Sequence, residues 1–156
     1  MGQTGVGQLR TATVEDVTEL LPLWALLFDE QDADPGQVWW GNARRWFGEV
    51  VSDQRVACLP VVVADDAVVA TAVGTLELGV PNPHCPRGRT VRLANVVTHP
   101  RHRGRGYGTL LVEHVVAWAA SIDADRVDLS ATPEGRRIYE RAGFVLTSAP
   151  RMKLTL

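Results

Sequence analysis

The N-terminal third of the chain contains one strand-like and two helix-like patterns of hydrophobic and polar residues. Residues 8–12 form a short strand-like run, and Thr13 followed three positions later by aspartate is typical of a capping box that opens a helix. Apolar side chains then recur every three or four positions from 17 to 28 and from 38 to 51, which predicts two amphipathic helices. We expect Pro22 to kink the first helix or to shift its start, because proline removes a backbone donor and crowds the preceding turn.

The middle of the chain has the pattern of β-strands. Residues 56–64 and 67–78 are rich in β-branched side chains, and the Asp65-Asp66 pair between them is typical of a hairpin turn. Residues 80–89 contain three prolines, so we expect a loop there, and long loops in compact domains are often functional. A further strand is predicted over 91–98.

Helical and strand-like patterns alternate again in the C-terminal third. Apolar residues at helical spacing from 111 to 122 predict a third amphipathic helix. We expect a strand over 126–130, a helix over 133–141 ended by the glycine that follows, and two last strands over 144–147 and 152–156. The whole order predicts an α/β fold in one domain, residues 1–156, with a mixed sheet of about six to seven strands and about four helices on its two faces.

A glycine-rich segment, Arg103-Gly104-Arg105-Gly106-Tyr107-Gly108-Thr109, lies between the 91–98 strand and the third helix. Three glycines within five residues allow the backbone to turn sharply and to approach a ligand without interference from Cβ atoms. The N-terminus of the helix adds about half a positive charge at the same place. The segment is therefore predicted to bind a phosphate or a pyrophosphate.

Other glycine motifs fit this segment less well. A Walker loop needs a Lys-Ser or Lys-Thr pair, which the chain lacks. A dinucleotide fingerprint that starts at Gly104 meets Thr109 at its third glycine position, and it lies late in the chain, although Asp123 is near the spacing of a ribose-binding acid. A surface turn with solvated arginines is the remaining alternative.

Composition narrows the classes of function. With 46% hydrophobic and 22% charged residues the chain has an ordinary globular composition, and its formal net charge of -2 argues against nucleic acid as the main partner. Cys58 and Cys85 fit neither a disulfide framework nor a paired-ligand metal site, so we expect reduced thiols and no metal. No signal-like or membrane-length apolar segment is present, which favours a cytoplasmic protein without a membrane partner.

Two motifs resemble those of the general-control-type N-acetyltransferase (GNAT) superfamily. The first is Arg103-x-x-Gly106-x-Gly108 after the 91–98 strand, and the second is Arg137-Ile138-Tyr139-Glu140-Arg141-Ala142-Gly143-Phe144. The resemblance extends to the order of elements along nearly the whole chain. It implies a transferase that moves an acetyl group from acetyl-coenzyme A (acetyl-CoA) to a primary amine of a small molecule or a protein. A non-catalytic module that senses acyl-coenzyme A is the alternative function.

The same resemblance implies roles for particular residues. The cofactor's pantetheine arm would pair with the backbone of Val96, Val97 and Thr98 in the manner of an added strand, with the N–H of Val96 facing the thioester carbonyl. The pyrophosphate would lie over the amides of residues 103–109. Tyr139 matches the tyrosine that donates a proton to the departing thiolate, whereas a tyrosine packed in the helix's apolar side is the structural alternative.

The general base and the acceptor are less constrained by the sequence. Some branches of the superfamily use a central-strand glutamate as base, but Arg92 stands at that position here, which leaves Glu77, His84, His99 or a water relay. Substrate choice is expected from the first two helices and the 80–90 loop. The acidic segment at 29–34 and its neighbours Trp39 and Trp40 are a candidate site for a cationic amine, although acidic loops are usually just solvated. Similar folds are commonly dimeric, so a homodimer is an open expectation.

Overall fold

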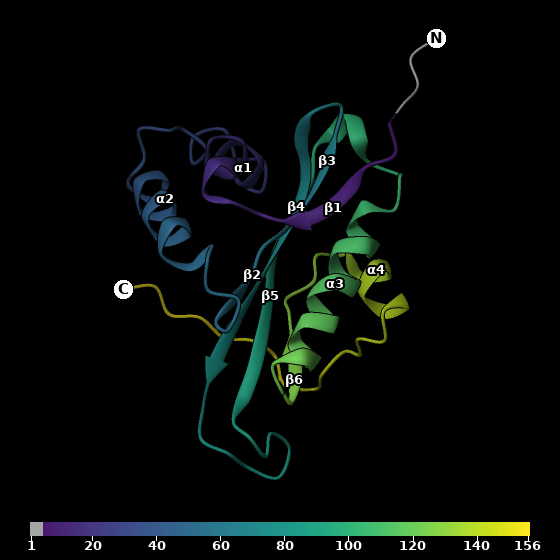
Figure 1. Cartoon of the computed structure of the whole chain (residues 1–156). Helices are drawn as coiled ribbons and strands as arrows, with labels where there is room; N and C mark the ends of the chain where they lie inside the picture. The colour runs from purple at the N-terminus through teal and green to yellow at the C-terminus, as the bar shows by residue number, and fades with distance from the viewer. Residues whose placement is uncertain (1–4) are drawn as a thin grey trace.

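The computed structural model describes residues 5–156 as a six-stranded mixed sheet with helices on both faces (Figure 1), which confirms the predicted fold class. The strands are β1 (Gln8–Thr11), β2 (Ala57–Cys58), β3 (Pro60–Ala64), β4 (Ala67–Leu78), β5 (Arg89–Thr98) and β6 (Arg126–Asp128). The α-helices are α1 (Val17–Ala25), α2 (Val38–Val50), α3 (Tyr107–Ser121) and α4 (Arg136–Arg141), and single 3-10 turns span Val14–Asp16 and Pro100–His102.

The sheet order is β1-β3-β4-β5-β6, with β2 paired to β4. All neighbouring strands are antiparallel except β5 and β6, which are parallel. Helices α1 and α2 cover one face, where Leu20, Trp24 and Phe47 are buried in one hydrophobic core. Helix α3 covers the other face, where Leu111 and Val115 are buried in a second core.

The predicted hairpin between β3 and β4 is confirmed. Asp65 and Asp66 both have positive φ angles, 51° and 60°, as a two-residue turn of type I′ requires. The single strand predicted over 56–64 is divided instead into β2 and β3. The division falls at Leu59, whose carbonyl accepts a hydrogen bond from the Ala12 N–H at 2.8 Å.

Two predictions for the C-terminal part are wrong. Residues 144–147 and 152–156 form no strands, and their apolar side chains are mostly exposed, because this segment pairs with no strand and Pro150 cannot donate to a ladder. Helix α4 begins three residues later than predicted, since a turn precedes it in which Gly135 N–H donates to Thr132 Oγ1 at 3.2 Å.

Helix α1 is shorter than its hydrophobic pattern predicts. It continues through Pro22 but ends at Ala25, and Leu27 and Phe28 beyond it are partly exposed. Its N-terminal side is fixed by side-chain contacts instead. The carboxylate of Glu19 accepts the N–H of Val68 at 2.8 Å, which ties α1 to the start of β4.

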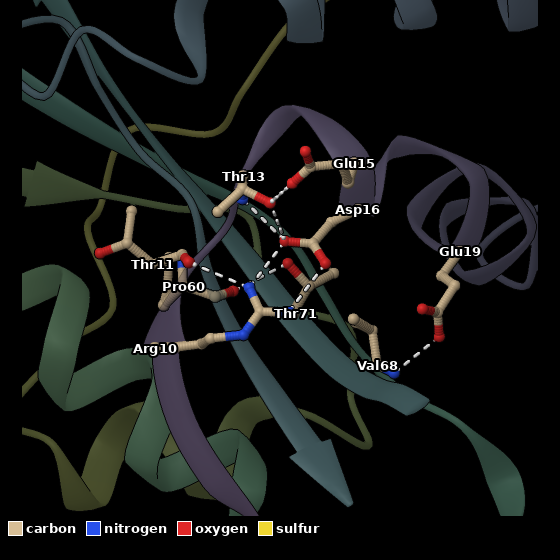
Figure 2. A network of polar contacts seen from close by, with 9 residues as sticks. All are labelled: Arg10, Thr11, Thr13, Glu15, Asp16, Glu19, Pro60, Val68 and Thr71. Carbon is tan, nitrogen blue, oxygen red and sulfur yellow. Dashed lines mark hydrogen bonds and ion pairs between the residues drawn. The ribbon is translucent and has the colours of Figure 1, made fainter. Parts of the chain in front are cut away.

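An ion pair joins β1 to the turn before α1 (Figure 2). Arg10 donates from its two terminal nitrogens to the two carboxylate oxygens of Asp16, at 2.7 and 2.8 Å. Asp16 also accepts the N–H of Thr13 at 2.7 Å, the acidic half of the predicted capping box. The residue is only 5% exposed, and the hydrogen bonds from Arg10 and Thr13 lower the pKa of its carboxyl group despite that burial.

We expect Asp16→Asn to lower the free energy of unfolding at pH 7 by about 1 to 3 kcal/mol, because a charge-assisted bidentate contact is lost. A carboxyl group whose pKa is lower in the folded than in the unfolded protein stabilises the fold at pH values above its unfolded pKa of about 3.9. This stabilisation is lost as the pH falls through the folded-state pKa. The difference between the two proteins should therefore shrink at pH 3, measured by urea unfolding. Asp53→Asn, at an exposed ion pair with Arg55, is the control and should change stability far less at either pH. A pH-independent difference for Asp16→Asn would contradict the role of the ion pair.

A glycine on β4 allows α3 to lie close to the sheet. A Cβ atom at Gly74 would lie 2.7 Å from Val115 Cγ1 and 3.3 Å from the Trp118 ring. Trp118 is itself anchored, because its indole N–H donates to the Gln54 carbonyl at 2.7 Å. Both side chains are buried, so neither can move away from an added Cβ atom without displacing its own neighbours.

Gly74→Ala is therefore expected to destabilise the protein by about 1 to 3 kcal/mol through overpacking. Gly48→Ala is the matched control, since Gly48 lies in α2 with no atom within 4 Å of a built Cβ. That change should be neutral or stabilise by up to about 1 kcal/mol through helix propensity. Thermal unfolding of both variants measures the effect, and equal stabilities would contradict the close-packing argument.

Candidate functional site

The two parallel strands at the centre of the site separate soon after they meet. β5 and β6 pair only from Thr90↔Arg126 to Arg92↔Asp128, whereas β5 continues to Thr98 (Figure 1). From Leu93 onward β5 is therefore bonded to β4 on one edge, and no strand among residues 5–156 pairs with its other edge. The backbone groups that face this opening between β5 and β6 are not used by the sheet.

A β-bulge lies in the unpaired half of β5. The register with β4 shifts there, and two β5 residues, Asn95 and Val96, lie opposite one β4 residue, Ala72. Asn95 has a positive φ of 51°, which asparagine tolerates better than most residues. The bulge reverses the side-chain alternation, so that Leu93 is buried under α3 and Val97 is buried under α1 and α2. Sequence reasoning missed Asn95, although a lone asparagine in a β-branched run is a signal for such a site.

The backbone N–H groups of the three predicted β5 residues, Val96, Val97 and Thr98, do not all point to the same side of the strand. His99 N–H donates to the Val69 carbonyl of β4 at 2.8 Å. Because antiparallel ladders alternate, the N–H of Val97 also points to β4, and those of Val96 and Thr98 point to the open edge. Two of the three residues thus present amides to the opening.

The glycine segment follows β5 after the 3-10 turn Pro100–His102, and it opens α3. Gly104 and Gly106 have positive φ angles of 75° and 81°, and Gly106 is the N-cap residue of α3. The space at their Cβ positions is open. The Arg103 N–H donates to the Pro100 carbonyl at 3.5 Å, and the next amide with a backbone acceptor, within the described residues 5–156, is that of Leu110, which donates to Gly106 at 3.1 Å. The amides of residues 104–109 are therefore free donors around a helix N-terminus, the arrangement that binds phosphate.

The other residues of the segment have different surroundings. Gly108 lies in the first turn of α3, not in a special backbone conformation, and its Cβ would lie 3.2 Å from Ile138 Cδ1 of α4. The side chain of Tyr107 is 8% exposed and belongs to the core under α3. Arg103 donates to the Thr98 carbonyl at 3.2 Å, and Arg105 is exposed beside it.

Tyr139 lies on α4, at a groove of about 690 Å³ along β6. Its ring packs edge-on against Phe144, with ring centroids 6.0 Å apart. Burial raises the pKa of the Tyr139 phenol. The hydroxyl therefore stays protonated at neutral pH and is able to donate a hydrogen bond or a proton.

The candidate bases lie in different places. Glu77 forms an ion pair with Arg92, with Arg92 Nε 3.3 Å from the carboxylate. His84 is exposed on the loop after β4. His99 follows β5 and accepts the N–H of Arg101 at 3.3 Å through its Nδ1 atom.

The acidic segment at 29–34 precedes α2, and Trp39 and Trp40 lie in the first turn of that helix. The indole N–H of Trp39 donates to the carbonyl of Asp32, and the rings of Trp39 and Trp40 are 5.2 Å apart. None of these residues belongs to the lining of the groove at Tyr139, as far as the described residues go. Substrate contact by this segment stays a hypothesis.

The two cysteines are buried and form no disulfide, and burial raises the pKa of Cys58 to about 12. Residues 5–156 contain no group of three or more histidine, cysteine, aspartate or glutamate side chains placed to hold a metal ion. No helix among them is both long and apolar enough to cross a membrane.

Comparisons with known proteins agree with this geometry. A protein from Clostridium acetobutylicum, described as a predicted acetyltransferase and solved with acetyl-CoA, superposes with a TM-score of 0.83 at 21% identity, over 96% of each chain. Glucosamine-6-phosphate N-acetyltransferase from Arabidopsis thaliana gives 0.78 at 21% identity, over 96% of this chain and 99% of the other. A putative acetyltransferase from Agrobacterium tumefaciens gives 0.74 at 27% identity, over 95% and 99%. These likenesses are to the fold.

The sequence itself matches the model of the Acetyltransferase (GNAT) family over residues 17–144. This range runs from the start of α1 to the residue after Gly143, and it includes β5, the glycine segment and Tyr139. The chain therefore belongs to the GNAT acetyltransferase family and is an N-acetyltransferase.

Proposed function

We propose that this acetyltransferase transfers an acetyl group from acetyl-CoA to a primary amine, and that acetyl-CoA binds in the opening between β5 and β6. The observation that carries the proposal is the unpaired edge of β5, which is followed, after the 3-10 turn Pro100–His102, by the free amides of residues 104–109. A strand edge followed by a phosphate-binding helix terminus matches a ligand with an amide-containing arm and a pyrophosphate.

The residues at this opening fit such a ligand. The amides at 104–109 and the N-terminal dipole of α3 would hold the pyrophosphate, with Arg103 and Arg105 as nearby positive charges. The amides of Val96 and Thr98 would pair with the pantetheine arm as an added strand does. Val97 would support this edge from within the ladder to β4, and Gly108 by keeping α4 close to α3.

Bound acetyl-CoA supplies an acetyl group activated as a thioester. We assign the Val96 N–H, which follows the bulge, as the donor to the carbonyl oxygen on which negative charge develops. Tyr139 gives a proton to the departing sulfur, and its raised pKa keeps that proton available at pH 7. Because Glu77 is engaged with Arg92, we infer that water carries away the proton that the attacking amine loses.

Acetyl-CoA at about a hundred times its dissociation constant is expected to stabilise the protein by about 2.7 kcal/mol. The Gly106→Ala variant should show a clearly smaller increase, because a positive φ disfavours alanine and displaces the amides that face the pyrophosphate. Each increase is measured by thermal unfolding against the same variant without ligand, so that the backbone strain itself cancels. No stabilisation of the unmodified protein at saturating acetyl-CoA would contradict the proposed site.

Replacing Tyr139 by Phe should lower kcat by about a hundredfold, because the leaving sulfur loses its proton donor. Binding of acetyl-CoA should stay nearly unchanged, since the ring and its contact with Phe144 are retained. Steady-state kinetics with an accepted amine and the thermal shift with acetyl-CoA measure the two effects separately. An unchanged kcat would remove Tyr139 from the mechanism.

A further inference from the structure

The groove along β6 has an unusual charge. Its lining includes the side chains of Arg92, Arg126, Arg136 and Arg151, but only two acids, Asp128 and Glu140. The chain as a whole has a formal net charge of -2. The lining thus has more arginines than acids in an overall acidic protein, and the same cavity contains Tyr139.

Three of the four arginines have a carboxylate partner. Arg92 pairs with Glu77 at 3.3 Å, and Arg126 is 3.4 Å from the carboxylate of its near neighbour on β6. Arg136 pairs with Glu140 at 2.6 Å, one turn along α4.

Arg151 is the exception. It donates to the hydroxyl of Ser130 at 2.6 Å, and it has no carboxylate partner among the described residues. A serine hydroxyl leaves the positive charge of the guanidinium group uncompensated. The remaining N–H donors of that group form a fork that matches a carboxylate or a phosphate.

We infer that the acceptor amine carries a carboxylate or phosphate group, which Arg151 and its arginine neighbours hold in this groove. The inference rests on the proposed function, because it describes the acceptor of the same reaction. Apolar side chains, among them Val127, Leu129 and Leu146, also line the cavity and strengthen the attraction by lowering the local dielectric constant. A purely cationic acceptor would be repelled there.

The groove is separate from the proposed pyrophosphate site. No residue of 103–109 contributes to its lining, so the phosphates of acetyl-CoA do not account for its charge. Tyr139 lies one turn beyond Arg136 on α4 and shares the lining with it. An acceptor with its anionic group at the arginines would therefore have its amine end near the proposed proton donor.

The test compares matched acceptors that differ only in the anionic group. The pairs are 6-aminohexanoate with 6-aminohexanamide, for a carboxylate, and glucosamine 6-phosphate with glucosamine, for a phosphate; spermidine represents a cationic amine. Release of the coenzyme A thiol gives the initial rates. The anionic member of at least one pair should have a kcat/KM about tenfold higher or more, and the pair that shows it identifies the anion.

Two variants locate the effect. Arg151→Gln should raise KM for the preferred anionic acceptor by about tenfold, leave kcat nearly unchanged and leave the neutral member within about twofold. Arg55→Gln is the matched control, because Arg55 is exposed, paired with Asp53 and absent from this groove. Equal rates within both pairs, a preference for spermidine, or an unchanged KM in Arg151→Gln would overturn the inference.

A failure of the proposed function would give a different result from a failure of this inference. The protein would then show no stabilisation by acetyl-CoA and no thiol release with any amine. In that case, calorimetric titration of 6-aminohexanoate and glucosamine 6-phosphate into the unmodified protein decides the anion site. Binding that Arg151→Gln weakens about tenfold supports the site, and no binding of either compound overturns it.

Discussion

The site depends on the hydrogen-bonding requirement of one strand, β5. Along its whole length one edge is bonded to β4, but on the other edge only residues 90–92 pair with β6. Backbone donors and acceptors that lose contact with water must find partners, and each unpaired buried group costs about 1 to 3 kcal/mol. The open half of β5 therefore favours occupants with amide groups of their own. After the 3-10 turn Pro100–His102, the glycine segment provides a second set of free donors at the terminus of α3, which an anion can accept.

The sequence was informative where structure is determined locally. The β3–β4 hairpin, the helical periodicity of α2 and α3, and the turn at Gly104 and Gly106 were all predicted from neighbouring residues. The predicted strands at 144–147 and 152–156 were wrong because an alternating pattern forms a strand only where a partner edge is available. For the same reason the sequence did not reveal where β5 and β6 separate.

In the candidate site, too, local sequence patterns identified some residues but not how the fold arranges them. Motifs directed attention to the glycine segment and to Tyr139, and the structure places these at the end of the open edge and in the groove beside β6. The different orientations of the Val96 and Val97 amides depend on the register with β4, which no local pattern reports. The arginines of the groove come from β5, β6, α4 and the C-terminal segment, and only the fold brings them together.

Because of the bulge at Asn95, the number of residues in β5 is as constrained as the kinds of residue that it contains. Residues on its N-terminal side contribute odd-numbered side chains to the core under α3, and Val97 on its C-terminal side contributes to the opposite core. Removing or adding one residue between them would exchange the two faces for everything that follows. Point substitutions in this stretch change one side chain each. A single-codon insertion or deletion would instead displace both cores and turn the Val96 amide away from the opening, so this short stretch is expected to vary in sequence far more readily than in length.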